Sequence, residues 1–172
     1  MDRICRNASL KSFHVFFFFL TLFCLSKPGD ALLAAKAKLV DPTNVLGSWD
    51  PNVWDYCTWF HITCDDSNQI IRIDLGMHSL SGTLAPELGS LKSLQNLELY
   101  KNNLTGNIPE ELGGLTSLQN LDLFNNMLTG SIPQSLTNLK SLLFLRLNSN
   151  KLTGRVPQGL RDSASSGKLK VL

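Results

Sequence analysis

Residues 94–117 read LQNLELYKNNLTGNIPEELGGLTS, and the next 24 residues, 118–141, read LQNLDLFNNMLTGSIPQSLTNLKS. The same spacing of apolar residues continues through 142–165 and extends back through 70–93, with more substitutions. The shared template is L-x-x-L-x-L-x-x-N-x-L-x-G-x-I-P-x-x-L-x-x-L-x-x. Four copies of one 24-residue unit indicate a solenoid, in which every unit stacks on its neighbours.

Each repeated position has a physical role. The x-L-x-L-x segment alternates with a period of two, which is typical of a short strand whose leucines point inward. Asn102, Asn126 and Asn150 recur at the bend after that strand. A buried asparagine there can satisfy backbone groups that the bend leaves without partners. We therefore expect an α/β solenoid with short parallel strands on its inner face and a core of stacked leucines.

Residues 27–69, which precede the repeats, are predicted to form an N-terminal cap. A short helix is expected at 31–39, with Asp30 as its capping residue. Trp49 and Trp59 bring large apolar side chains into this segment, and we expect both in the core.

Residues 1–26 have the pattern of a secretory signal: a basic start, an apolar run at 13–25 and small residues at the end. The apolar run is shorter than the ~20 residues that span a bilayer, although a retained membrane anchor is the alternative. The signal holds three of the 16 basic and one of the 14 acidic residues, which leaves 13 of each. We expect a secreted, extracellular (apoplastic) protein, and its balanced charge gives no indication of nucleic acid as a partner.

Two of the four cysteines, Cys57 and Cys64, lie outside the signal. An even number of cysteines in an exported chain favours a disulfide. The alternative is a metal site built from Cys57, His61 and Cys64, but a fourth ligand is missing nearby. We predict the disulfide, and neither a cofactor nor a metal.

The repeat pattern weakens after Leu160, and Ser163 stands where a leucine is due. Residues 169–172 resemble the first strand of a fifth repeat, displaced by three residues. We predict four repeats over 70–165 and a truncated, disordered start of a fifth repeat over 166–172. The exposed end favours either a monomer or weak self-association.

The strand positions predict three columns of side chains on the inner face. They are Arg72, Asn96, Asn120 and Phe144; Asp74, Glu98, Asp122 and Arg146; Gly76, Tyr100, Phe124 and Asn148. Acids on neighbouring strands lie about 5 Å apart, as in a glycosidase pair, but an open sheet does not exclude water from a general acid. We therefore predict no enzymatic activity. Exposed aromatics such as Tyr100 and Phe124 indicate a binding patch instead.

Residues 29–157 resemble the ectodomain of plant somatic embryogenesis receptor kinases, and still more the short secreted plant leucine-rich-repeat proteins related to them. The resemblance is carried by GDAL at 29–32, VLGSWD at 45–50, CTWFHITC at 57–64, IDLG at 73–76, LELYKNN at 97–103 and FLRLN at 144–148. It implies a right-handed superhelix with a helical, disulfide-bonded cap. Unlike those receptor kinases, and like the short secreted relatives, the chain is expected to lack a proline-rich stalk, a transmembrane helix and a kinase.

In those receptor kinases the ectodomain is a co-receptor that closes over a steroid or peptide held by a larger leucine-rich-repeat receptor kinase. The resemblance implies that Phe60, His61 and Tyr100 contact such an extracellular partner. Two departures stand against docking: Asn96 replaces a tyrosine, and Leu143 replaces a basic residue. With the aromatic pattern added, the predicted partner-binding residues are Phe60, His61, Tyr100, Phe124, Phe144 and Arg146.

The function predicted from these observations is an extracellular protein-interaction module in plant signalling or defence. One alternative is an inhibitor of pathogen cell-wall-degrading enzymes, although such inhibitors carry about ten repeats rather than four. Another is a truncated product without function. Asn103 begins the one N-x-S/T sequon outside the signal, so we predict an N-glycan on it.

Overall fold

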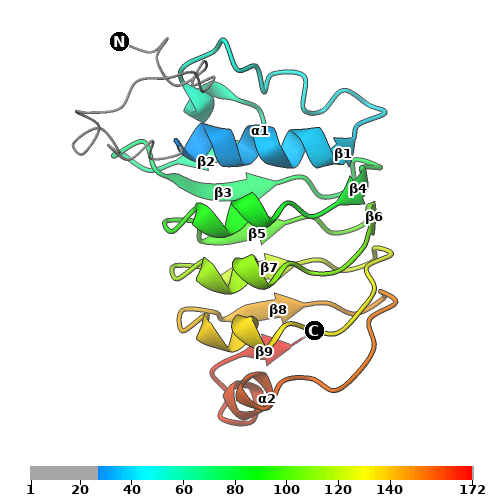
Figure 1. Cartoon of the computed structure of the whole chain (residues 1–172). Coiled ribbons are helices and arrows are strands. Elements are labelled where there is room, and N and C mark those ends of the chain that lie inside the picture. The colour runs from blue at the N-terminus through cyan, green and yellow to red at the C-terminus, as the bar shows by residue number, and fades with distance from the viewer. Residues whose placement is uncertain (1–26, 172) are drawn as a thin grey trace, which may run out of the picture.

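The computed structural model describes residues 27–171, which form a solenoid of stacked units with a helical cap at one end (Figure 1). The predicted signal at 1–26, including Cys5 and Cys24, lies outside the described residues. Within the described part, no helix is long and apolar enough to cross a membrane. The predicted solenoid of short parallel strands is confirmed.

The inner face is a six-stranded sheet in the order β2-β3-β5-β7-β8-β9. The strands are β2 (Ile62–Cys64), β3 (Ile70–Asp74), β5 (Asn96–Glu98), β7 (Asn120–Asp122), β8 (Phe144–Arg146) and β9 (Lys170–Val171). Strand β2 is antiparallel to β3, and every later pair is parallel. Arg72 pairs with Asn96, Asn96 with Asn120 and Asn120 with Phe144, which confirms the first predicted column.

The opposite side of the solenoid is built from short 3-10 helices, η2 (Pro86–Ser90), η3 (Glu110–Gly114) and η4 (Gln134–Asn138). A second sheet of β1 (Leu39–Val40), β4 (Ser81–Thr83) and β6 (Asn103–Thr105), in the order β1-β4-β6, lies beside the main sheet (Figure 1). The sequence did not predict this sheet. Between the layers lies one continuous core, in which Leu97 and Leu121 have no exposed surface.

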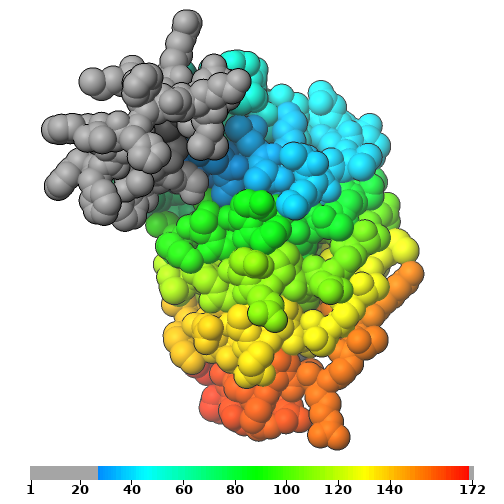
Figure 2. Space-filling model, viewed as in Figure 1, coloured from blue at the N-terminus to red at the C-terminus, as the bar shows by residue number. Residues whose placement is uncertain are grey.

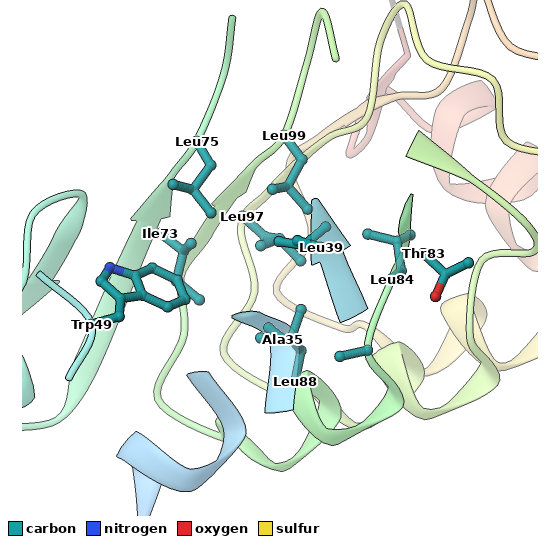
Figure 3. A pocket seen from close by; sticks show the side chains of 11 residues that line it. Ala35, Leu39, Trp49, Ile73, Leu75, Thr83, Leu84, Leu88, Leu97 and Leu99 are labelled. Atoms are coloured by element: carbon teal, nitrogen blue, oxygen red, sulfur yellow. The ribbon is translucent and has the colours of Figure 1, made fainter. Parts of the chain in front are cut away.

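The interior near the cap is closely filled. Side chains from the cap, such as Ala35 and Trp49, meet Ile73, Leu84 and Leu97 from the first two repeats (Figure 3). The gap left among them is about 10 Å³, which is at the lower limit for a single water molecule. A ligand therefore finds no room in this part of the core.

The repeated asparagines form a ladder of hydrogen bonds, as predicted. The Asn102 amide group donates to the carbonyl oxygens of Leu75 (2.7 Å) and Leu99 (3.0 Å), and its Oδ1 accepts from the N–H groups of His78 (3.1 Å) and Leu80 (3.0 Å). Asn126 and Asn150 repeat the pattern one and two units further on. Each asparagine of the ladder thus links two consecutive repeats through backbone N–H and carbonyl groups that would otherwise lack hydrogen-bond partners at the bend.

The cap helix α1 (Pro28–Lys38) begins earlier than predicted. Asp30 lies inside its first turn rather than before it, and its carboxylate accepts the backbone N–H of Lys27 at 2.9 Å. Trp49 and Trp59 are buried and stacked, with ring centroids 5.9 Å apart, which confirms their place in the core.

Cys57, in the short helix η1 (Tyr56–Thr58), forms the predicted disulfide with Cys64 in β2. The two Cα atoms lie 5.6 Å apart, within the range that a disulfide spans. The bond uses both thiols, so the alternative metal site has no thiolate ligands left.

The end of the chain differs from the prediction of a fourth repeat up to residue 165 and a disordered segment over 166–172. Residues 158–165 form α2 (Gln158–Ser165), and β9 pairs with β8 through Lys170 and Phe144. The step from Phe144 to Lys170 is 26 residues, so the strand is displaced by two residues from the 24-residue period, not three. Leu160 and Leu169 are buried, and this burial holds the segment against the fourth repeat.

Candidate functional site

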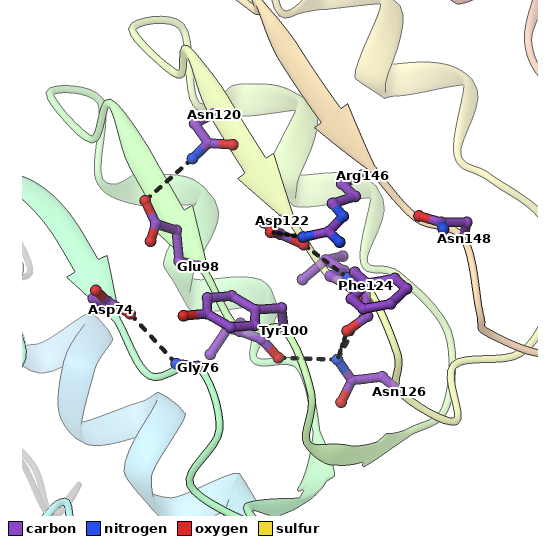
Figure 4. A network of polar contacts seen from close by, with 12 residues as sticks. Asp74, Gly76, Glu98, Tyr100, Asn120, Asp122, Phe124, Asn126, Arg146 and Asn148 are labelled. Carbon is purple, nitrogen blue, oxygen red and sulfur yellow. Dashed lines mark hydrogen bonds and ion pairs between the residues drawn. The ribbon is translucent and has the colours of Figure 1, made fainter. Parts of the chain in front are cut away.

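The six predicted binding residues lie at the inner sheet and its N-terminal edge. We call them the aromatic surface: Phe60, His61, Tyr100, Phe124, Phe144 and Arg146. His61 directly precedes β2, and its backbone carbonyl oxygen accepts the N–H of Asp74, which attaches this segment to the N-terminal edge of the sheet. The structure brings Tyr100, Phe124 and Arg146 together on neighbouring repeats (Figure 4). Phe144 stands in the column beside them on β8 and is 40% exposed.

Tyr100 is positioned by a glycine in the repeat before it. A Cβ atom placed on Gly76 would stand 2.4 Å from Cε1 of Tyr100, so the phenol ring rests directly on the Gly76 backbone. The Tyr100 carbonyl oxygen accepts the N–H of Met77 at 2.9 Å, which fixes the backbone of the two repeats next to each other. The ring is half-buried as a result, and its other face is open to the outside (Figure 4).

Phe124 is positioned by an arginine in the repeat after it. The guanidinium carbon of Arg146 lies 4.0 Å from the centroid of the Phe124 ring, and Arg146 also forms an ion pair with Asp122 at 3.2 Å. Asp122 in turn accepts the backbone N–H of Phe124 at 3.0 Å. The ring, the guanidinium and the carboxylate therefore hold one another in place, and a cation over an aromatic face is attractive by itself.

Phe60 and His61 form the N-terminal end of the surface. The Phe60 side chain is 69% exposed, while its backbone is fixed: its N–H donates to Ser48 Oγ, and its carbonyl oxygen accepts the Trp49 indole N–H. The His61 ring meets the ring of His78 edge to face, with centroids 4.7 Å apart. An exposed aromatic ring on a fixed backbone needs little ordering when it binds.

The acidic column of the inner face is neutralised by its neighbours. Arg72 forms ion pairs with Asp74 (3.0 Å) and Glu98 (2.9 Å), and Asn120 donates a hydrogen bond to Glu98. Burial raises the pKa of Glu98 above its usual value, against the opposing effect of Arg72. Among the described residues, no group of three or more His, Cys, Asp or Glu side chains is placed to hold a metal ion.

The sequence did not indicate three contacts of this surface. They are Gly76 beneath Tyr100, His78 beside His61, and Lys170, whose ammonium lies 5.5 Å from the Phe144 ring. The contact between Gly76 and Tyr100 could have been predicted from the sequence, because the two residues stand next to each other in one column. A glycine beside a large ring leaves room for that ring. The other two depend on a loop and on the displaced strand β9, which the repeat period does not place.

Comparisons with protein families agree with this architecture. Residues 26–65 match the leucine rich repeat N-terminal domain, and residues 93–115 and 117–139 match the leucine rich repeat. Leucine-rich repeat protein 1 of Arabidopsis thaliana is 60% identical over 73 residues, which are 42% of this chain and 34% of that protein. The chain thus spans about a third of the length of the curated relatives that it matches.

Solved structures extend the likeness to most of the chain. The BIR2 ectodomain from Arabidopsis thaliana is 36% identical, with a TM-score of 0.76 over 85% of this chain and 78% of that one. A chain of the Arabidopsis thaliana BIR3–SERK2 complex is 35% identical, with a TM-score of 0.73 over 83% of this chain and 77% of that one. Both are plant leucine-rich-repeat ectodomains, a class of protein that typically binds other molecules rather than catalysing reactions.

Proposed function

The chain belongs to the plant leucine-rich-repeat proteins, and on this basis we propose that it is a secreted protein-interaction module of plant signalling or defence. The proposal is carried by one observation: the Tyr100 and Phe124 rings on the inner face are partly exposed and are held in fixed positions. Tyr100 rests on Gly76, and Phe124 lies beneath Arg146. Rings that are ordered before binding lose little entropy in a complex, which is why such residues dominate binding energy at interfaces.

The proposed partner is an extracellular protein, either a larger leucine-rich-repeat receptor kinase or such a receptor with its peptide or steroid. Support comes from the likeness to a chain of the BIR3–SERK2 complex, in which two such proteins are joined. The size of the surface limits its affinity. The five strands from β2 to β8 lie about 4.8 Å apart and give the aromatic surface a width of only about 20 Å, which suits an auxiliary partner in a larger complex.

We expect Tyr100→Ala combined with Phe124→Ala to weaken partner binding by about 2 kcal/mol, because each anchor contributes at least ~1 kcal/mol. The protein, bearing an affinity tag, is incubated with leaf extracellular fluid, and the proteins that it retains are quantified by mass spectrometry. The matched control is Trp54→Ala, which removes an aromatic that is 71% exposed but lies outside the aromatic surface. Equal recovery of the same partners by wild type and the double variant would show that the surface is wrongly assigned.

Gly76→Ala makes the same test sharper. It leaves both rings in the sequence but places a methyl group where the Tyr100 ring now rests. The proposal requires that this variant also loses the partners, because the displaced ring no longer presents the same face. Retained binding by Gly76→Ala together with lost binding by the double variant would indicate that the aromatic area matters but its orientation does not.

We also propose that Asn103 carries an N-glycan. Its side chain is exposed on β6, and the sequon hydroxyl, Thr105 Oγ1, lies on the same strand, where it donates to Gly82. Glycosidase treatment of plant-made protein should increase its gel mobility, and Asn103→Gln should migrate like the treated wild type. A glycan there projects from the second sheet and leaves the aromatic surface uncovered. Unchanged mobility after treatment would contradict glycosylation at this site.

A further inference from the structure

Met77 lies in the chain between the two residues that hold rings of the aromatic surface. Gly76 supports the Tyr100 ring, and the ring of His78 meets that of His61 with centroids 4.7 Å apart. Met77 itself is 61% exposed. Figure 2 shows the repeats as successive bands of colour, in which the first repeat, in green, adjoins the cap, in blue and cyan. Met77 therefore lies where the aromatic surface passes from the cap to the repeats.

The backbone at Met77 is held in a left-handed conformation by its place in the repeat. Its φ is +65°, and the equivalent residues Lys101, Asn125 and Ser149 have φ values of +52°, +55° and +58°. The bend after each strand thus imposes a conformation that residues other than glycine rarely adopt. The Met77 N–H also donates to the carbonyl oxygen of Tyr100 at 2.9 Å. The side chain starts from a fixed point, so only its own rotational freedom is lost on binding.

The methionine differs in chemistry from the other three residues of this row. The bend accepts a lysine, an asparagine and a serine in the later repeats, so its conformation does not require an apolar residue. A long apolar side chain that is mostly exposed gains from burial against a partner, whereas a polar one stays hydrated. Methionine is also unbranched and polarisable, so it adapts to apolar groups and contacts aromatic rings through its sulfur. These properties are those of a binding residue.

We infer, on the basis of the function proposed above, that Met77 is an oxidation-sensitive anchor of the aromatic surface: it binds an apolar side chain of the partner protein and releases it when its sulfur is oxidised to the sulfoxide. The oxidant is hydrogen peroxide. The sulfur lone pair attacks one peroxide oxygen, the O–O bond breaks, the sulfur loses two electrons and the other oxygen leaves as water. The sulfoxide is polar, so its burial against an apolar group without a hydrogen-bond donor is unfavourable.

Met127, the other methionine among residues 27–171, provides a matched comparison. It is 40% exposed, and its N–H donates to the carbonyl oxygen of Leu104 in β6, beside the second sheet and outside the aromatic surface. Cys57 and Cys64 are joined in the disulfide, so neither presents a thiol to the oxidant. Because Met77 is the more exposed of the two methionines, we expect it to react first.

The test measures the recovery of partners from leaf extracellular fluid by tagged protein before and after mild treatment with hydrogen peroxide. Only proteins that the wild type retains and Tyr100→Ala/Phe124→Ala loses are counted. Peptide mapping follows sulfoxide formation at Met77 and Met127. The oxidised wild type should recover these proteins at least about five-fold less, which corresponds to the loss of one anchor. Treatment with methionine sulfoxide reductases of both epimer specificities should restore the recovery.

Three variants assign the effect to one sulfur atom. The quantity compared is the ratio of recovery after peroxide to recovery before it. In Met77→Leu this ratio should not fall, because leucine has no sulfur to oxidise, whereas in Met127→Leu it should fall as in the wild type. Met77→Gln places a polar side chain of similar length at the site, and it should lower recovery about five-fold without any oxidant.

The inference is overturned if the wild type, with Met77 fully oxidised, still recovers its partners, or if Met77→Leu remains sensitive to peroxide. Full recovery by Met77→Gln, or resistance to peroxide in Met127→Leu, would overturn it as well. Each of these results leaves the proposed function standing, provided that Tyr100→Ala/Phe124→Ala loses the partners. If the wild type and that double variant retain the same proteins before oxidation, the proposed function fails, and the role of Met77 fails with it.

Discussion

Asn102→Leu is expected to lower the free energy of unfolding by about 4 kcal/mol or more, because it leaves buried backbone groups without partners at ~1–3 kcal/mol each. Leucine is close to asparagine in size, so the cost comes from lost hydrogen bonds rather than from a cavity. The groups concerned are the N–H of His78 and Leu80 and the carbonyl oxygen of Leu75, whereas the Leu99 carbonyl oxygen keeps the hydrogen bond that it accepts from Asn126. Urea unfolding followed by circular dichroism measures the change.

Two further variants show whether the ladder itself is responsible. Asn148→Ala removes an exposed asparagine whose side chain makes no hydrogen bond within the described residues, and it should stay within about 0.5 kcal/mol of wild type. Asn150→Leu breaks the last rung, which is only partly buried, so water can replace some of the lost bonds and the effect should be intermediate. An Asn102→Leu protein as stable as Asn148→Ala would mean that the ladder contributes nothing to stability.

The repeat period placed most of the inner face correctly, and the reason is geometric. Strands in a solenoid stack in register, so a constant 24-residue step puts equivalent residues into one column. The pairings of Asn96 with Asn120 and of Glu98 with Asp122 follow from this step alone. The sequence could therefore place Tyr100 and Phe124 next to each other. Whether these residues bind a partner is a separate question, which the variants above test.

Features that depend on a single contact could not be predicted from the sequence. The second sheet uses three-residue strands such as Ser81–Thr83, which are too short to show an alternating pattern and exist only because neighbouring repeats align them. Arg72 bridges Asp74 and Glu98 through side-chain geometry that spacing does not specify. The sequence therefore showed Asp74, Glu98 and Asp122, all partly buried, only as a column of acidic residues without their ion-pair partners.

The C-terminal segment is the part of the chain that the 24-residue repeat period predicts least well. The repeat pattern weakens after Leu160, and residues 158–165 form the helix α2, with Leu160 buried, in place of the end of a regular fourth repeat. A helix tolerates small and polar residues such as Ser165 on its exposed side, and the burial of Leu160 attaches it to the repeats. The strand that follows pairs with β8 at a 26-residue step, because the added helical residues lengthen the connection.

Removal of the disulfide is expected to cost about 2–3 kcal/mol of stability in Cys57→Ser/Cys64→Ser, because the closed loop is short and the unfolded chain regains its freedom. The bond joins η1 to β2, which pairs with β3 at the first repeat. We therefore expect the loss to appear first as weaker hydrogen-exchange protection in residues 56–64, while β7 and β8 keep theirs, because each repeat depends mainly on its neighbours. Reducing agent should destabilise the wild type equally and leave the double variant unchanged. If the variant unfolds at the same urea concentration as the oxidised wild type, the cap is held by Trp49 and Trp59 rather than by the disulfide.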